Sequence, residues 1–174
     1  MKKFILVFTL LISSFATAYT CSDIKKLNSI QRDTLVEAFL YGYPKDIGFT
    51  LAAIVWKESS AGLWKINISD PSAGIAHNHL KYSLIRLGIK DTSFNRNVLA
   101  QRLVDNNQLS LSLAVEEIEY WFDRHNGNWQ KTRASYNQGN HWASQNGTKY
   151  SKDVLDRLRI LKDCGTFSAY QQRF

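Results

Sequence analysis

The segment DIGFTLAAIVWKES, residues 46–59, carries the pattern that decides the fold. Its apolar residues Ile47, Leu51 and Ile54 are spaced at i, i+4 and i+7, which predicts a helix with one apolar face. Glu58 continues this series at i+11. At 100° per residue it points within about 20° of Ile47. We therefore expect an acidic side chain in line with the apolar face.

Glu58 also lies at the carboxyl end of the predicted helix, where the helix dipole disfavours an anion. The dipole and the apolar surroundings both favour the protonated carboxyl. A carboxyl that stays protonated near neutral pH can serve as a general acid. The alternative is an ordinary solvated glutamate at a frayed helix end, and this helix alone leaves both interpretations open.

Helical spacing continues through most of the chain. The loop-forming residues Gly62, Asn67, Asp70 and Pro71 interrupt it, and they predict a loop over residues 60–72. No segment has a convincing strand pattern, although a small hairpin in that loop would escape detection. The sequence predicts an all-α domain, or a mainly α domain with a minor hairpin. Further helices are expected over residues 24–43, 73–87, 97–104, 111–125, 129–137 and 154–161.

The amino-terminal residues 1–18 have the features of a signal peptide. Two lysines precede an apolar run over residues 4–12, and Ala-Thr-Ala at residues 16–18 forms a small-x-small cleavage signal. The apolar run is about half of the roughly 20 residues that a membrane span needs. We therefore expect an exported protein, in the periplasm or elsewhere in the cell envelope, without stable membrane insertion.

Length and composition indicate a single globular domain over residues 19–174. The full chain has 174 residues, of which 44% are hydrophobic and 21% charged, and this excludes collagen, coiled coil and wholesale disorder. Its formal net charge of +7 suits an anionic envelope polymer, an acidic lipid surface or a nucleic acid. The basic residues are spread out, however, so we expect weak steering or a simply solvated surface, and no nucleic-acid partner.

The two cysteines, Cys21 and Cys164, lie near the ends of the expected mature domain. Export implies an oxidising compartment, so a disulfide between them is expected. Because it would close a long loop, it would stabilise the fold by up to about 5 kcal/mol in the chain-entropy model. Two free thiols are the alternative.

Two further segments bear on the interpretation of Glu58. They are SDPSAGIAHN at residues 69–78 and ASYNQG at residues 134–139. Together with Glu58-Ser59, and in this order, they resemble the motifs of the SLT-type lytic transglycosylase family. These motifs are Glu-Ser ending an apolar helix, a Gly-Leu-Met-Gln-like helix start and Ala-x-Tyr-Asn-x-Gly. The resemblance spans about residues 35–142. It implies a lysozyme-like helical domain with a substrate cleft, which acts on peptidoglycan glycan strands without a cofactor.

The resemblance also implies roles for individual residues. Glu58 would be the single catalytic acid/base. In this family, the motif tyrosine lies near the glutamate, and the asparagine helps to hold the substrate's N-acetyl group or the loop around it. His77 departs from the glutamine that is usual at its position, and it can titrate where glutamine cannot. The residues implied to bind substrate or support Glu58 are Ser59, Ser69, Ser72, Gly74, His77, Tyr136 and Asn137.

The reaction implied by the resemblance breaks the bond between N-acetylmuramic acid (MurNAc) and N-acetylglucosamine (GlcNAc). Glu58 would protonate the glycosidic oxygen and then take a proton from the 6-hydroxyl of the sugar, which closes a 1,6-anhydro ring. Because no water is consumed, this reaction does not need the second carboxylate of ordinary glycosidases. The resemblance also implies cell-envelope or secretion-apparatus proteins as the class of protein partner.

Alternative functions remain open from the sequence. Asp70 would make the enzyme a hydrolytic muramidase if its carboxylate held a water molecule against the sugar, whereas its simpler role is an Asp-Pro turn before a helix. A non-catalytic peptidoglycan-binding module would keep the cleft without needing Glu58. No metal site is expected, because His77 and His79 would point apart at i, i+2 on a helix.

Overall fold

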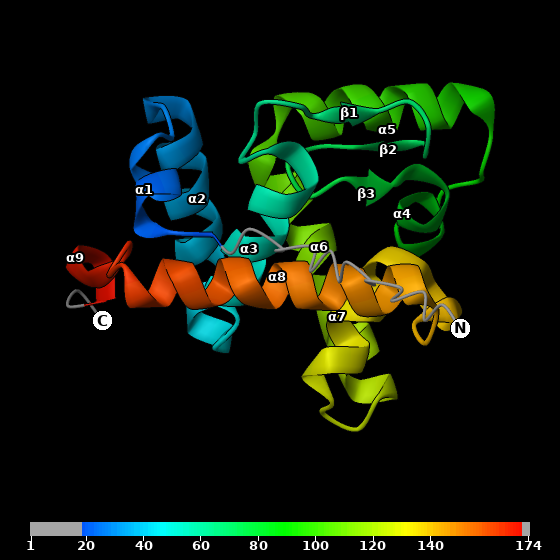
Figure 1. Cartoon of the computed structure of the whole chain (residues 1–174). Coiled ribbons are helices and arrows are strands. Elements are labelled where there is room, and N and C mark those ends of the chain that lie inside the picture. The colour runs from blue at the N-terminus through cyan, green and yellow to red at the C-terminus, as the bar shows by residue number, and fades with distance from the viewer. Residues whose placement is uncertain (1–18, 172–174) are drawn as a thin grey trace, which may run out of the picture.

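The computed structural model describes residues 19–171, so the predicted signal peptide at residues 1–18 lies outside the described residues (Figure 1). Short 3₁₀ helices occupy Tyr43–Lys45 and Gly139–His141. No helix within residues 19–171 combines the length and the apolar character that a membrane crossing requires. The remaining elements are α1 (Cys21–Lys25), α2 (Ser29–Gly42), α3 (Gly48–Ser59), β1 (Ile66–Asn67), β2 (Ser72–Ala73), β3 (Asn78–His79), α4 (Leu80–Arg86), α5 (Ser93–Asp105), α6 (Asn107–Arg124), α7 (Trp129–Gln138), α8 (Gln145–Asp163) and α9 (Ser168–Gln171).

The predicted fold class, mainly α with a minor hairpin, is confirmed. The small sheet has the order β1-β2-β3, with antiparallel neighbours throughout. In Figure 1 the sheet lies with α4 and α5 on one side of the molecule, and α1 and α2 lie on the other. In this view the long helix α8 runs across the molecule below both groups.

The helix predicted over residues 73–87 is wrong in its first half. Residues 73–79 form a strand, a turn and a second strand, and α4 begins only at Leu80. Gly74 has a φ of +84°, and a Cβ at this position would lie 2.4 Å from the Ser110 hydroxyl oxygen. A distant contact with α6 therefore sets the backbone here and overrides the local helical pattern.

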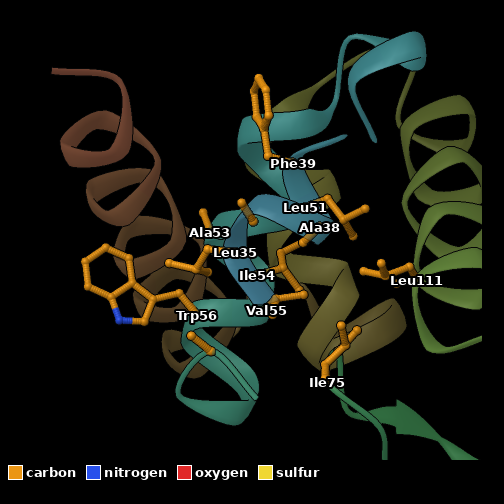
Figure 2. Packing of buried hydrophobic residues seen from close by; sticks show 14 of the residues in the cluster. Leu35, Ala38, Phe39, Leu51, Ala53, Ile54, Val55, Trp56, Ile75 and Leu111 are labelled. Carbon is orange, nitrogen blue, oxygen red and sulfur yellow. The ribbon is translucent and has the colours of Figure 1, made fainter. Parts of the chain in front are cut away.

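Helix α3 is buried on almost every side, not on one face as its spacing predicted. Its residues Leu51, Ala53 and Val55 have no exposed surface, because α2, α6 and α8 all pack against it. Figure 2 shows Leu35 of α2 and Leu111 of α6 in the same cluster of buried side chains. The helix that ends at Glu58-Ser59 is thus held rigidly by the largest part of the core.

A second, smaller apolar cluster joins β2 to α4, α5 and α6, and it includes Leu80, Leu84 and Leu103. Helix α6 belongs to both clusters, since Leu111 faces the large one and Leu113 faces the small one. The molecule therefore consists of a large helical part and a smaller part built from the sheet, α4 and α5, with α6 joining them.

The predicted disulfide between Cys21 and Cys164 is present, and it joins α1 to the end of α8 across a sequence separation of 143. Within the described residues there is no free cysteine. Because α1 has no buried residue of its own, the disulfide is a principal attachment of this helix to the domain.

Candidate active site

A cleft of about 720 Å³ lies between the two parts of the molecule. The sheet and α4 line one side, while α6, the end of α7 and residues 139–141 line the other. Its volume falls in the usual range for a ligand-binding pocket. Several residues that the sequence singled out contribute to its lining: Glu58, Asp70, Ser72, His77, Tyr136 and Asn137. Ser59, Ser69 and Gly74 do not line it.

Glu58 lies where the end of α3 meets the cleft, with only 14% of its side chain exposed. The Tyr150 hydroxyl donates a hydrogen bond to Oε1 of Glu58. The other carboxylate oxygen, Oε2, lies 3.4 Å from Nδ1 of His77. Glu58 is therefore not the solvated glutamate at a frayed helix end that its position left open.

Tyr150 comes from α8 and was missed by sequence reasoning. Burial, followed by the nearby charge of Glu58, raises the pKa of Tyr150 well above its usual value, so the hydroxyl remains a hydrogen-bond donor. One signal pointed to it: Tyr150 precedes Val154 and Leu161 at helical spacing and extends their apolar face towards the amino terminus.

Tyr136 lies in the cleft, but its hydroxyl donates to the carbonyl of Ala76 at 2.9 Å. Burial and the carboxylates of Glu117 and Glu58 raise the pKa of Tyr136 well above its usual value, so it is also neutral. The tyrosine that hydrogen-bonds Glu58 directly is thus Tyr150, while Tyr136 holds the turn before His77.

The turn that carries His77 is anchored on Ser110 of α6. The Ala76 amide donates to the Ser110 hydroxyl at 3.1 Å, and that hydroxyl donates to Oδ1 of Asn78 at 2.6 Å. Asn78 Nδ2 in turn donates to the Ser110 carbonyl at 3.1 Å. His77 has a φ of +46°, which is uncommon for a residue other than glycine. Gly74 thus has a structural role in this turn, and no direct place in the cleft.

Ser59 is completely buried and joins α3 to this turn. Its Oγ lies 2.7 Å from the Ile75 carbonyl and 3.1 Å from the Val55 carbonyl, and it accepts a hydrogen bond from the Gly62 amide at 2.8 Å. Ser59 therefore connects the end of α3, next to Glu58, to the turn at Ile75 and to the loop at Gly62.

Replacing Ser59 with alanine should lower the free energy of unfolding by about 1–3 kcal/mol, because buried backbone groups of Ile75 and Gly62 lose their partner. Urea unfolding of the Ser59→Ala variant measures this change. Ser112→Ala is the matched control, since the Ser112 hydroxyl bonds only the Leu109 carbonyl of its own helix. Equal losses in the two variants would contradict the bridging role of Ser59.

The two serines before the second-motif glycine have different positions. Ser72 is 3% exposed and lines the cleft, whereas Ser69 lies in an exposed turn and donates its hydroxyl to Oδ1 of Asn67 at 2.7 Å. Only Ser72 is therefore placed to contact a ligand. Asn137 also lines the cleft, where its Oδ1 accepts from Nε2 of Gln138 at 2.7 Å.

Asp70 lies in the turn between β1 and β2, with 56% of its side chain exposed. The turn is followed by strand β2 and not by a helix, so the turn that the sequence predicted is present but the helix expected directly after it is wrong. Its Oδ1 lies 3.5 Å from Nε2 of His79, whose Nδ1 is buried without a hydrogen-bond partner. Asp70 and Glu58 line the same cleft.

A further carboxylate in the cleft, Glu117 of α6, was not identified from the sequence. Its Oε2 lies 3.1 Å from Nη1 of Arg86, and its Oε1 accepts from the Trp121 ring nitrogen at 3.3 Å. Arg86 is the sole lysine or arginine among the described lining residues. No local pattern signals this pair, because its partners are 31 positions apart in the chain.

Among residues 19–171, no three histidine, cysteine or acidic side chains are grouped so that they could hold a metal ion. His77 and His79 lie on a turn and a strand rather than on the expected helix. Each faces a different carboxylate, Glu58 for His77 and Asp70 for His79. The cleft therefore contains acid–base pairs of side chains.

One similar protein is an uncharacterised 20.7 kDa protein from Enterobacteria phage T4, encoded in the vs–regB intergenic region. It is 29% identical over 180 residues, which cover 94% of this chain and 95% of the phage protein. No protein-family model matches the chain, and no solved structure matches it.

Proposed function

We propose that the protein is an exported lytic transglycosylase that cleaves the MurNAc–GlcNAc bond of peptidoglycan and leaves a 1,6-anhydroMurNAc end. The observation that carries this proposal is the setting of Glu58. Its carboxyl is largely buried at a cleft, and it is held between a tyrosine hydroxyl and a histidine ring. The order of the three sequence motifs supports the same reaction.

In the proposed reaction, protonated Glu58 gives its proton to the glycosidic oxygen while the bond from this oxygen to C1 of MurNAc breaks. The 6-hydroxyl of the same sugar then forms a bond to C1, and its proton passes to Glu58. The carboxyl is thereby restored and no water is consumed. One carboxyl group in two successive roles suffices for this sequence of steps.

Tyr150 has a specific part in these steps, because it donates to Glu58 and stays protonated. When Glu58 loses its proton, the hydroxyl stabilises the carboxylate that forms, as hydrogen bonds to charged groups are stronger than neutral ones. The cleft residues Tyr136 and Asn137 of the third motif are proposed to contact the sugar close to Glu58.

Replacing Tyr150 with phenylalanine should reduce glycan cleavage by about 10- to 100-fold, since a hydrogen bond to a charged group contributes about 1.5–3 kcal/mol. The initial rate of solubilisation of purified sacculi measures this loss. Tyr82→Phe is a control at the exposed rim of the cleft. A Tyr150→Phe variant that cleaves at the wild-type rate would contradict the role proposed for Tyr150.

Mass spectrometry of the products from purified sacculi tests the proposed function. We expect muropeptides that end in 1,6-anhydroMurNAc and lack the water that hydrolysis would add. Soluble products with only reducing MurNAc ends would exclude the transglycosylase reaction. The absence of any soluble product, with sacculi still bound, would favour the non-catalytic binding module.

A hydrolytic muramidase is the second candidate, and the position of Asp70 favours it. Its carboxylate is half exposed in the same cleft as Glu58 and faces His79, so a water molecule bound there would have a base beside it. The variant Asp70→Asn separates the two reactions. A muramidase should lose cleavage in this variant, whereas a transglycosylase should still release anhydro products.

A further inference from the structure

We propose that Glu58 and His77 hold one proton between them, so that His77 is a positioning residue that keeps the catalytic proton available to Glu58. This inference rests on the proposed function for its effect on cleavage. The shared proton itself is argued from the contacts of the pair and does not depend on the proposed function. The second motif placed His77 among the residues that bind substrate or support Glu58. In this proposal His77 acts through Glu58 and does not bind the sugar.

The first step concerns which ring nitrogen of His77 carries a hydrogen. Nε2 lies 2.7 Å from the backbone carbonyl of Trp64. A carbonyl oxygen can only accept a hydrogen bond, so Nε2 must carry the proton of the neutral ring. Nδ1, the nitrogen that faces Glu58, is then the lone-pair nitrogen whenever the ring is neutral.

The second step follows from the 3.4 Å between Nδ1 of His77 and Oε2 of Glu58. Two protonation states make this contact favourable, and in each of them one proton lies between Nδ1 and Oε2. Either protonated Glu58 donates to the neutral ring, or the charged ring donates to the Glu58 carboxylate. Without that proton, a carboxylate oxygen would face a nitrogen lone pair, which is repulsive. The pair therefore resists losing it as the pH rises.

The surroundings of the pair favour retention of the proton. Only 9% of the His77 side chain is exposed, and 14% of that of Glu58. Burial opposes the charged ring, but hydrogen bonds to Glu58 and to the Trp64 carbonyl outweigh it, and the pKa of His77 is raised above its ordinary value. The negative charge of Asp70 acts in the same direction.

Most other titratable groups around the cleft contact partners other than Nδ1 of His77. Tyr150 donates to the far oxygen of Glu58, and Tyr136 donates to the Ala76 carbonyl. Glu117 on α6 is paired with Arg86 on α4. His79 on β3 faces Asp70, and His141 lies in the 3₁₀ helix at the exposed rim. Within the described residues, His77 is the histidine whose imidazole contacts Glu58.

The backbone of His77 supports a functional reason for its position. Its left-handed conformation is held by the Ser110 anchor and by Gly74, whose carbonyl accepts a hydrogen bond from the His77 amide at 3.2 Å. Such a conformation is unfavourable for a residue with a Cβ and persists only where the surroundings enforce it. The enforced turn directs the ring between Trp64 and Glu58.

The pH dependence of cleavage by wild type and His77→Gln tests the proposal. Glutamine can still donate a hydrogen bond to Glu58 but cannot hold the shared proton, so the alkaline limb should move at least about one pH unit lower. The maximal rate should stay within about tenfold of wild type. His141→Gln, at the exposed rim of the cleft, should keep the wild-type limb. A uniform fall at every pH, with no shift of the limb, would overturn the proposal.

Nitrogen NMR of the folded protein tests the shared proton without any substrate. We expect the hydrogen on Nε2 of neutral His77, and a titration that moves about one to two pH units lower in Glu58→Gln. A hydrogen on Nδ1, or an unchanged titration, would overturn the proposal. If wild type cleaves no glycan at any pH, the proposed function fails, and this measurement still decides whether the pair exists.

Discussion

Replacing Glu58 with glutamine is expected to reduce glycan cleavage by at least about 1,000-fold while leaving the domain folded. General acid–base groups typically contribute factors of about 100 to 10,000, and Glu58 would fill both roles in the two proposed steps. Glutamine has nearly the same shape, but it has no acidic proton to give to the glycosidic oxygen. Because the proposed mechanism has no second acid, we expect a loss near the upper end of that range.

The fold should tolerate this change for two reasons. The amide oxygen of glutamine can still accept a hydrogen bond from Tyr150, and the amide nitrogen can donate to Nδ1 of His77. The apolar residues of α3 that pack in the core, such as Leu51 and Val55, are unchanged by the substitution. Thermal unfolding of the variant should therefore give a midpoint close to that of wild type.

Release of soluble muropeptides by the purified Glu58→Gln variant measures the effect, and binding to sacculi is recorded in parallel. We expect binding to persist while release disappears. A variant that releases products at more than a tenth of the wild-type rate would show that Glu58 is not the acid. If wild type and variant bind equally and neither releases product, the protein is a binding module.

The position of Glu58 could be predicted because the information was local. A helical period over fourteen residues is enough to place it at the carboxyl end of a helix, and α3 spans Gly48–Ser59 in the structure. The same local method failed over residues 73–79. There the decisive contact is between Gly74 and Ser110. These residues are far apart in the chain, so the spacing of apolar residues within residues 73–87 cannot predict the contact.

The partners of Glu58 were harder to predict for the same reason. Tyr150 is 92 positions away, and only its place on the apolar face of α8 distinguishes it from other tyrosines. No spacing or motif in the sequence predicts the Arg86–Glu117 ion pair. His77 was identified by a motif, but its partner Trp64 contributes a backbone carbonyl, a group that no residue type reveals. The sequence thus identified Glu58 and part of the lining of the cleft, and the structure shows which groups contact Glu58.

Removing the Cys21–Cys164 disulfide is expected to lower the free energy of unfolding by up to about 5 kcal/mol. The bond spans a sequence separation of 143, so its loss frees nearly the whole domain in the unfolded state. A domain of this size has a total stability of about 5–15 kcal/mol. The double variant Cys21→Ser, Cys164→Ser should therefore unfold at a much lower urea concentration than the oxidised protein.

The candidate active site should nevertheless survive in the folded fraction of this variant. The disulfide joins α1 to the carboxyl end of α8, whereas Tyr150 lies near the amino end of that helix. Tyr19 also holds the same corner: the Arg157 guanidinium lies 4.3 Å from the centre of its ring and 4.9 Å from that of Trp56. The chain therefore keeps a second attachment next to α1 when the disulfide is absent.

Urea unfolding with and without a reducing agent separates these effects. The reducing agent should lower the midpoint of wild type towards that of the double serine variant and leave the variant itself unchanged. Cleavage per folded molecule should be similar in all samples at low urea, because the bond constrains the unfolded chain and does not position Glu58. Equal midpoints for oxidised and reduced wild type would show that the bond contributes little. Lost cleavage in a fully folded variant would show that α1 reaches the active site through α8.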